Sequence, residues 1–387
     1  MKTYLVTGAA GFIGTNFVKY MLEKHGETIR LLVLDKLTYA GNLENLQAEI
    51  EAQKVIFIKG DIRNQELVQY LFSEYDIDYI VNFAAESHVD RSIKNPQIFI
   101  ETNVLGTQNL LEVAKKFWTI GKDEKGYPIY KEGKKYLQIS TDEVYGSLSK
   151  DYSEPADLVL EGTIKKLTKG REHLKTYGKH FFTEKTPLKP NSPYSASKAS
   201  SDLLVMAYYE TYKLPINITR CSNNYGPYQF PEKLIPLMIK NILEGKQLPV
   251  YGDGGNVRDW LYVKDHAKAV DMIIHRGKIG EIYNIGGLNE KKNSNIVKLI
   301  LNTIGKIMRE EIEYRKVLKT DLENINYQLI SYVQDRLGHD ERYAILPEKI
   351  ITELGWYPET TFETGIELTI RWYLENQIWV ENVKDKN

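Results

Sequence analysis

Two adjacent carboxylates follow directly on an apolar segment of the chain. Residues 134–141 read KKYLQIST, and Asp142 and Glu143 come next. A pair of neighbouring acids is most often a solvated turn. In a partly desolvated site, however, two such acids split their pKa values, so that one stays protonated while the other ionises. We therefore interpret Asp142 and Glu143 as a candidate acid and base that titrate as one unit.

A glycine-rich turn near the N-terminus has the composition of a phosphate-binding site. The stretch VTGAAGFIG places Gly8, Gly11 and Gly14 between a strand-like run and a helix-like run. Glycine suits this place because the turn is tight and the backbone must approach a pyrophosphate held at the helix N-terminus. Asp35 ends the next strand-like run, where a carboxylate accepts both hydroxyls of an adenosine ribose and repels a 2′-phosphate. The pattern favours NAD over NADP, and its alternative is a glycine turn that serves helix packing only.

A tyrosine and a lysine at helical spacing form the third candidate group. Tyr194 and Lys198, in SPYSASK, are four residues apart and so share one helix face. Tyrosine, with a reference pKa of about 10, is a poor base at neutral pH, but a neighbouring ammonium and a cationic nicotinamide would both favour its phenolate. Tyr194 stands out because it follows the fifth predicted strand, whose end carries Thr141. Other pairs with this spacing are assigned to helix surfaces or loops: Tyr20/Lys24, Tyr127/Lys131 and Tyr209/Lys213.

The elements that would position these groups alternate along the first half of the chain. Short apolar runs predict strands, and the amphipathic segments between them predict helices. Strands that are apolar throughout indicate a parallel sheet covered on both faces, in which ligands bind at the carboxyl ends of the strands. We expect an α/β fold, a Rossmann-type doubly wound parallel sheet. The predicted strands cover residues 3–8, 30–35, 54–61, 78–85, 134–141 and 216–222, and the predicted helices residues 12–26, 64–75, 97–118 and 194–213.

The alternation divides the chain into two parts. Residues 1–222 are predicted to form the NAD-binding domain. Residues 223–387 are predicted to form mainly a smaller lobe that binds the substrate, with some elements returning to the first domain, because prolines there separate shorter elements. Two insertions interrupt the first domain. Residues 119–135 are polar and are interpreted as a surface loop, and residues 147–186 are basic and are interpreted as a partly helical excursion over the surface.

The composition argues against several kinds of partner. The 387 residues include 51 Lys and Arg against 52 Asp and Glu, a formal net charge of −1, so no overall field would attract nucleic acid or an anionic membrane. The single cysteine, Cys221, forms no internal disulfide, and no stretch approaches the roughly 20 apolar residues that span a bilayer. We expect a soluble cytoplasmic protein. We expect no metal site, because the histidines are scattered: His25, His88, His173, His180, His266, His275 and His339.

The glycine-rich turn, together with Thr141 and the pair Tyr194 and Lys198, resembles the extended short-chain dehydrogenase/reductases. Five stretches narrow the resemblance to the dTDP-glucose 4,6-dehydratase family. They occur in the family's order, and the match runs from residue 3 to about residue 357, although the two insertions are longer than the family usually has. The stretches are DKLTYAGN (35–42), AAESHVDRSI (84–93), STDEVYG (140–146), SPYSASKASSD (192–202) and NNYGPYQFPEKLIP (223–236).

The resemblance implies a reaction and a role for each catalytic residue. In this family the C4 hydroxyl of the sugar is oxidised by hydride transfer to NAD, water leaves from C5 and C6, and the hydride returns to C6. Tyr194, with Lys198 beside it, would be the base at O4, and Thr141 would hydrogen-bond the same oxygen. Glu143 would remove the C5 proton, and Asp142 would protonate the departing C6 hydroxyl.

The resemblance also implies two sets of binding residues. "DRLGHD" (335–340) has Leu337 where the family has proline, so the shape of that loop stays open. The NAD set is Gly8, Gly11, Phe12, Ile13, Gly14, Asp35, Lys36, Leu37, Thr38, Asp61, Ile62, Phe83, Ala84, Ala85, Ser87, Thr102, Tyr194, Lys198 and Asn224. The sugar-nucleotide set is Ser87, Thr141, Asn223, Lys233, Leu234, Pro249, Tyr251, Arg258, Asn293, Asp335, Arg336 and His339.

Two other functions remain as alternatives. A sugar-nucleotide 4-epimerase would need Thr141, Tyr194 and Lys198 but not the pair Asp142 and Glu143. A dinucleotide-binding regulator without activity would have no reason to keep all of them. Whether the base of the substrate is thymine, uracil or cytosine stays open. The resemblance further implies a homodimer formed through the helices near residues 97–118 and 194–213.

Overall fold

A parallel β-sheet is the centre of the structure. The computed structural model describes residues 1–158, 174–335 and 339–384, and in this part of the chain seven strands form one sheet in the order β14-β10-β7-β4-β1-β2-β3, with every pairing parallel. The expected doubly wound sheet is therefore confirmed. Its strands are β1 (Lys2–Thr7), β2 (Ile29–Asp35), β3 (Val55–Lys59), β4 (Tyr79–Asn82), β7 (Lys135–Thr141), β10 (Ile216–Cys221) and β14 (Ile282–Ile285).

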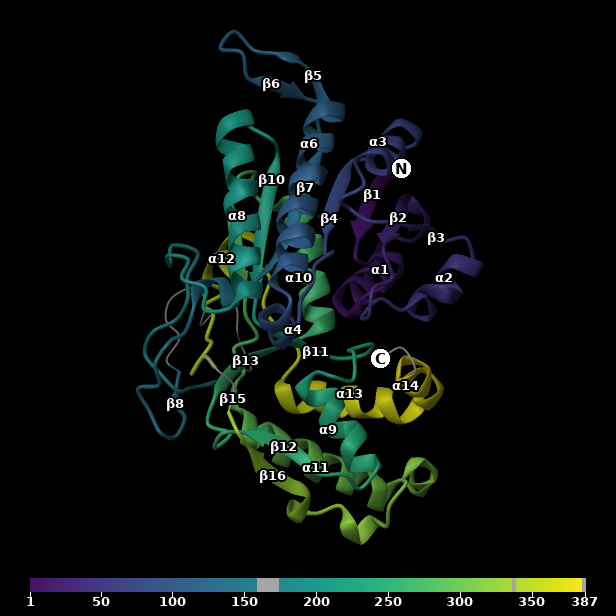
Figure 1. Cartoon of the computed structure of the whole chain (residues 1–387), viewed down its shortest axis with the longest axis vertical. Coiled ribbons are helices and arrows are strands. Elements are labelled where there is room, and N and C mark those ends of the chain that lie inside the picture. The colour runs from purple at the N-terminus through teal and green to yellow at the C-terminus, as the bar shows by residue number, and fades with distance from the viewer. Residues whose placement is uncertain (159–173, 336–338, 385–387) are drawn as a thin grey trace.

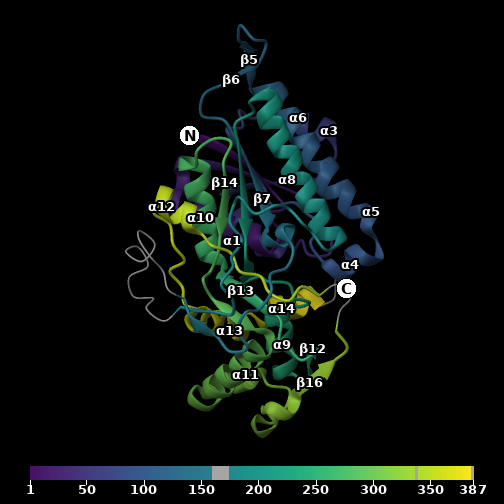
Figure 2. The same ribbon diagram turned by 90° about the vertical axis from the view of Figure 1, so that its left-hand side faces the viewer.

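Helices cover both faces of this sheet, which is why its inner strands are apolar throughout. On one face lie α1 (Phe12–His25) and α10 (Val263–Arg276), and on the other lie α3 (Gln65–Glu74), α6 (Gly106–Trp118) and α8 (Pro193–Tyr212) (Figure 2). Phe17 of α1 and Ile273 of α10 are completely buried in the first layer, and Leu110 and Val205 in the second. The strand order reverses direction between β1 and β4, and in such sheets the crevice at this point binds ligands.

The segment predicted as a single helix over residues 97–118 is interrupted. It consists of α5 (Pro96–Phe99), a π-helical stretch over Ile100–Leu105, and α6. Single π-helical turns within longer helices occur often at functional sites. Here the stretch contains Thr102, which lines the cavity described below.

The second part of the chain builds a smaller lobe with its own apolar core (Figure 1, lower part). The lobe contains α9 (Leu234–Leu243), β12 (Leu248–Tyr251), α11 (Asn293–Glu310), β16 (Ile330–Val333), α13 (Phe362–Glu375) and α14 (Gln377–Lys384). Between its elements the chain returns to the first sheet, because α10 and β14 belong there and α12 (Glu348–Leu354) packs against β14. A small sheet joins β11 (Asn223–Tyr225), β13 (Val257–Tyr262) and β15 (Glu290–Lys292), and the short helices α2 (Gln47–Glu51) and α4 (Val89–Lys94) complete the first part.

The first insertion is more regular than the predicted surface loop, and the prediction for the second insertion falls in part on residues outside the described part. Residues 119–135 contain a β-hairpin, β5 (Thr119–Lys122) and β6 (Pro128–Tyr130), which projects at the top of Figure 1, and the Tyr130 hydroxyl donates to the Tyr212 carbonyl at 2.8 Å. The ends of the second insertion pair as β8 (Ala156–Asp157) and β9 (Lys175–Thr176), and the fully buried Arg342 donates to the Gly178 carbonyl and to Glu290. Residues 159–173 lie outside the described part.

No helix among the described residues combines the length and the apolar character that a membrane crossing requires.

Candidate active site

A cavity of about 320 Å³ opens at the carboxyl ends of β1, β2, β4, β7 and β10. It brings together residues from the glycine-rich turn, the strand ends, the start of α8 and the segments at 221–224 and 229–233. All five predicted catalytic residues line it, as do all the predicted NAD residues except Leu37. The lining residues predicted for the sugar nucleotide are Ser87, Thr141, Asn223 and Lys233.

The glycine-rich turn leaves no room for side chains. Gly8 has φ 67°, and a Cβ there would lie 2.6 Å from the Ala84 Cα atom; a Cβ on Gly14 would lie 2.6 Å from the Ala9 Cα atom. The turn can therefore close tightly between β1, β4 and α1 only with glycine. The first turn of α1 contains no acidic residue, so no carboxylate of the helix itself opposes an anion at its N-terminus.

Asp35 at the end of β2 is fixed by the same turn. Its Oδ2 accepts the Ala10 N–H at 2.9 Å, and its Oδ1 accepts the Leu37 N–H at 2.8 Å. Burial raises the pKa of this carboxyl, and the two N–H groups oppose the rise. Leu37 does not line the cavity itself. Its backbone N–H orients the Asp35 carboxylate, which does. A buried, oriented carboxylate beside the glycine-rich turn fits the ribose of a dinucleotide.

Asp61 lines the cavity next to Asp35's strand. Although burial raises its pKa, hydrogen bonds from Arg63 and Lys36 lower it to about 2. The Lys36 ammonium lies 3.0 Å from an Asp61 carboxylate oxygen. Both predicted NAD residues, Lys36 and Asp61, therefore form one ion pair at the edge of the cavity.

The adjacent acids begin a short 3₁₀ helix directly after β7. Thr141, the last residue of the strand, accepts the Glu143 N–H on its hydroxyl at 3.3 Å and donates that hydroxyl to Asp142 Oδ1, also at 3.3 Å. Asp142 is 1% exposed, and its Oδ2 has no hydrogen-bond partner among the described residues. An orphaned carboxyl oxygen on a residue that lines the cavity is suited to a substrate hydroxyl.

The surroundings separate the two acids electrostatically. Burial, followed by the charges of Glu143 and Asp259, raises the pKa of Asp142 well above its usual value. Burial also raises the pKa of Glu143, but the cations Lys233 and Arg258 oppose that rise. Asp142 is therefore the group that keeps its proton, and Glu143 is the group that ionises more readily.

Tyr194 and Lys198 lie in the first two turns of α8, which Ser192 and Ser195 cap reciprocally. Both side chains are buried and line the cavity. The Lys198 ammonium donates to the Ile139 carbonyl of β7 at 2.7 Å. In the chain alone, burial and then Glu143 raise the pKa of Tyr194 well above its usual value, so the lysine by itself does not produce the phenolate that the sequence predicts.

A buried charge network that the sequence analysis missed lies behind Lys198. Asp202 follows Lys198 by one helical turn and binds Arg220 Nε at 2.8 Å, and Arg220 in turn donates to the Tyr145 hydroxyl at 3.0 Å. Burial lowers the pKa of Lys198, and the Asp202 charge opposes this effect. The signal in the sequence was the spacing of Lys198 and Asp202, since positions four apart share a helix face.

The predicted sugar-nucleotide residues fall into two groups. Lys233 lies at the cavity, and Arg258 acts on both acids, with its guanidinium 4.2 Å from the Tyr343 ring centroid. Leu234, Pro249, Tyr251, Asn293, Asp335 and His339 do not line the cavity and belong to the second lobe and the loop after it. There the rings of Tyr251 and His339 meet edge to face, and His339 binds Asp335 at 2.6 Å. Arg336 and Leu337 lie outside the described residues.

Tyr39 is a further cavity residue that the sequence analysis did not single out. The Arg91 guanidinium lies 3.6 Å from the centroid of its ring, and Phe230 meets the ring edge to face at 5.9 Å. Both Tyr39 and Phe230 line the cavity. These contacts link the loop after β2 with α4 and with the segment before α9, so Tyr39 closes one side of the cavity.

A parallel sheet with a dinucleotide pocket and a Thr-Tyr-Lys group is typical of NAD-linked enzymes of one family. The chain belongs to the NAD-dependent epimerase/dehydratase family, whose model matches residues 4–286. Within it, the chain is similar to the dTDP-glucose 4,6-dehydratase of Salmonella typhimurium, with 48% identity covering 98% of this chain and 95% of that protein. It is also 45% identical to the dTDP-glucose 4,6-dehydratase of Neisseria meningitidis, covering 99% and 96% of the two chains.

A solved structure agrees with these relatives. The crystal structure of dTDP-glucose 4,6-dehydratase from Bacillus anthracis, in complex with NAD, superimposes with a TM-score of 0.78 at 45% identity, covering 99% of this chain and 100% of that one. The UDP-glucose 4-epimerase of Thermotoga maritima has a TM-score of 0.73 at 24% identity, covering 97% and 99%, which shows a common fold.

Proposed function

We propose that this protein is an NAD-dependent hydro-lyase that converts dTDP-glucose to dTDP-4-keto-6-deoxyglucose. The observation that carries the proposal is the pair Asp142 and Glu143 at the same cavity as Tyr194, with different electrostatic surroundings for the two acids. Relatives at 45–48% identity over nearly the whole chain carry the name of this activity. The epimerase alternative is weaker, because a 4-epimerase has no use for a second acid–base pair.

The dinucleotide pocket fits NAD. The glycine-rich turn and the free N-terminus of α1 would hold the pyrophosphate, and Asp35 would accept the adenosine ribose hydroxyls. Bound NAD would supply the hydride acceptor for sugar C4, the hydride donor for C6, and a positive charge that favours the Tyr194 phenolate. That charge matters because burial and Glu143 hold the pKa of the tyrosine high in the chain alone.

The residues of the chain would move protons at three atoms of the sugar. Tyr194 would take the O4 proton while the Thr141 hydroxyl orients O4. The C4 ketone acidifies the proton on C5, which Glu143 would remove. Asp142, which keeps its proton, would donate it to the C6 hydroxyl so that water leaves. Glu143 would then return a proton to C5 as the hydride reaches C6.

The diphosphate and the nucleoside would reach from the cavity toward the second lobe. Lys233 and Arg258 are the cations that would bind the diphosphate. Tyr251, with His339 and Asp335 around it, is the group proposed to receive the pyrimidine, in this case thymine. Because Tyr251, His339 and Asp335 do not line the cavity, we expect the sugar nucleotide to extend from the cavity to these residues.

The experiment that tests this function is product analysis after incubation with dTDP-glucose, UDP-glucose and CDP-glucose separately. We expect a 4-keto-6-deoxy sugar, identified by mass and NMR, to form fastest from dTDP-glucose. Formation of dTDP-galactose would show an epimerase instead. Turnover of UDP-glucose or CDP-glucose in preference to dTDP-glucose would leave the reaction standing and contradict the proposed base.

We also propose that the protein acts as a homodimer in the cytoplasm. Three large apolar side chains are exposed on the expected helices: Ile100 at 46%, Leu105 at 52% and Leu203 at 62%. The cytoplasmic location is supported by the single cysteine, which is buried and forms no disulfide. Light scattering on the wild type and on Leu203→Asp should give a dimer and a monomer, respectively. A wild-type monomer would contradict the proposal.

A further inference from the structure

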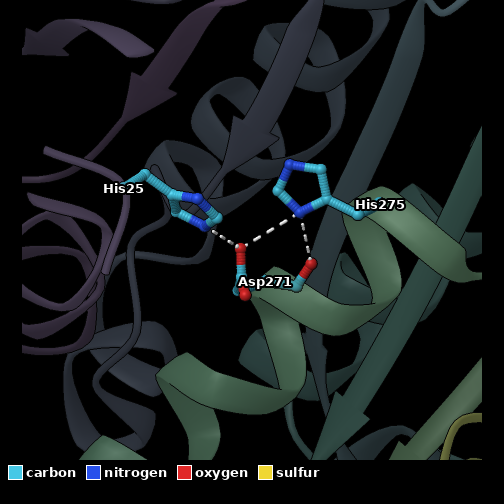
Figure 3. Close-up of side chains that lie close together, drawn as sticks. All are labelled: His25, Asp271 and His275. Atoms are coloured by element: carbon cyan, nitrogen blue, oxygen red, sulfur yellow. Dashed lines mark hydrogen bonds and ion pairs between the residues drawn. The ribbon is translucent and has the colours of Figure 1, made fainter. Parts of the chain in front are cut away.

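Two histidines and an aspartate converge on the face of the sheet that α1 and α10 cover (Figure 3). His25 is the last residue of α1, and Asp271 and His275 lie one turn apart on α10. His25 Nε2 is 2.8 Å from Asp271 Oδ1, and His275 Nδ1 is 3.0 Å from the same oxygen. Figure 3 shows the two imidazoles approaching this carboxylate from two sides.

We propose that His25, Asp271 and His275, called here the clasp, form a binding site for a divalent transition-metal ion such as Zn²⁺. Two imidazole nitrogens and one carboxylate oxygen are ligands that such ions prefer, with water completing the set. One ligand atom from each residue lies within 4.8 Å of the others. Ligands about 2.1 Å from zinc are roughly 3.0–3.4 Å apart at ordinary angles, and the two imidazole–carboxylate distances, 2.8 and 3.0 Å, are close to that range.

The surroundings of His275 show how a metal would replace a proton. Its Nδ1 also lies 2.8 Å from the Asp271 carbonyl oxygen, which can only accept, so Nδ1 donates in the metal-free chain. The Tyr4 hydroxyl lies 2.6 Å from the other nitrogen, Nε2. On metal binding Nδ1 would lose its proton, and an Nε2–H donating to the Tyr4 oxygen would fix the ring in the ligating tautomer.

The charges at the clasp have opposite effects on a cation. Burial raises the pKa of Asp271, but hydrogen bonds from His275, Lys24 and His25 lower it well below its usual range, so the carboxylate is ionised. The Lys24 ammonium lies 2.5 Å from Asp271 Oδ2 and would repel a metal ion. The Lys24 side chain is 45% exposed and can turn into solvent. Lys24 contacts Oδ2 of Asp271, so Oδ1 remains for the metal ion. We infer that Lys24 weakens the affinity of the site without blocking it.

The clasp joins the C-terminus of α1 to α10, far from the proposed chemistry. The glycine-rich turn lies at the other end of α1, and a helix of 14 residues is about 21 Å long. A metal ion bound there would cross-link α1 and α10, the two helices that cover one face of the sheet. Its binding should raise stability and leave turnover unchanged, so its failure and the failure of the proposed dehydratase reaction are separate outcomes.

The test is calorimetric titration of the full chain with zinc chloride, using protein without a histidine tag that has been stripped with a chelator. We expect one zinc ion per chain with a dissociation constant in the micromolar range. At a zinc concentration one hundred times that constant, the Tm should rise by roughly 3 °C, given the unfolding entropy of a chain of this size. Magnesium chloride should give no such rise, because Mg²⁺ prefers oxygen ligands.

Three variants separate the clasp from other zinc sites. His25→Gln keeps a donor toward Asp271 but loses a good ligand, so zinc affinity should fall at least tenfold while the metal-free Tm stays near that of the wild type. Lys24→Gln should bind zinc more tightly than the wild type. His180→Ala removes an exposed histidine elsewhere and should change neither value. Absence of zinc binding, or binding unaffected by His25→Gln, would overturn the proposal.

Discussion

At the scale of single residues, Asp142 and Glu143 are chemically similar neighbours with different surroundings. Asp142 is almost completely buried, and burial, Glu143 and Asp259 raise its pKa against Arg258. Burial also raises the pKa of Glu143, but Lys233 acts together with Arg258 to lower it. This difference gives each acid its proposed role. The sequence predicted that the pair would split its pKa values, but only the fold reveals which neighbour is the protonated one, because Arg258 and Asp259 come from a distant strand.

Replacing Asp142 by asparagine should lower activity and raise stability. The folded-state pKa of Asp142 lies above its unfolded value, so the native chain binds the proton more tightly and the carboxyl costs stability once the pH rises above about 4. Asp142→Asn removes that cost. We expect kcat to fall by roughly 10²-fold or more, and the Tm at pH 7 to exceed that of the wild type by a margin that shrinks as the pH falls toward 4. A lower Tm at pH 7 would contradict this account.

Replacing Asp202 by asparagine should move the pH profile of turnover. The Asp202 charge opposes the burial that lowers the pKa of Lys198. In Asp202→Asn the lysine should therefore lose its proton at a lower pH, and the basic limb of the kcat profile should shift to lower pH. Asp202→Glu keeps the charge and serves as the control, with its limb close to that of the wild type. An unshifted limb in Asp202→Asn would mean that Asp202 only holds Arg220.

Among the secondary-structure elements, the strands and helices around the site could be predicted from the sequence. Which of the later strands joins the first sheet could not. β7 and α8 agree closely with the predicted residues 134–141 and 194–213, because apolar runs and helical spacing are local properties. The sequence analysis expected some elements after residue 222 to return to the first domain, but it did not identify β14 as the strand that joins the first sheet. The β5–β6 hairpin was missed because its residues are polar and its strands are short.

The strand–turn–helix element at the N-terminus yields a prediction on cofactor binding. In Gly14→Ala the new methyl group would lie 2.6 Å from the Ala9 Cα atom and 2.7 Å from the Gly8 carbonyl oxygen, so the turn must open. We expect NAD affinity, measured by calorimetry, to fall at least tenfold. Circular dichroism should show the same helix content as in the wild type. Unchanged NAD affinity would place the pyrophosphate elsewhere.

At the scale of the whole molecule, buried charged pairs join segments that are far apart in the sequence. Arg342 is fully buried and binds Glu290, the Thr176 hydroxyl and the Gly178 carbonyl. It therefore connects the end of the second insertion with β15 and with the loop before α12. Neither this pair nor the clasp was visible in the sequence, because His25 and Asp271 are 246 residues apart, although the spacing of Asp271 and His275 was a signal that we missed.

Removing one partner of the buried pair should destabilise the whole fold. Arg342→Ala leaves the Glu290 carboxylate buried without its guanidinium, which typically costs about 3–5 kcal/mol. Arg371→Ala is a matched control, because its ion pairs with Glu311 and Glu367 are exposed to solvent, where such pairs contribute little to stability. Urea unfolding measures both values. A cost for Arg342→Ala no larger than that for Arg371→Ala would refute the role of this pair.

The central claim is that Glu143 exchanges the C5 proton of a dTDP-sugar with solvent during an elimination. The most direct measurement is turnover of dTDP-glucose in deuterated water, with NMR analysis of the product. We expect a 4-keto-6-deoxy sugar with deuterium at C5 from the wild type, and neither product nor label from Glu143→Gln. A product without deuterium at C5, or full labelling by Glu143→Gln, would contradict the claim.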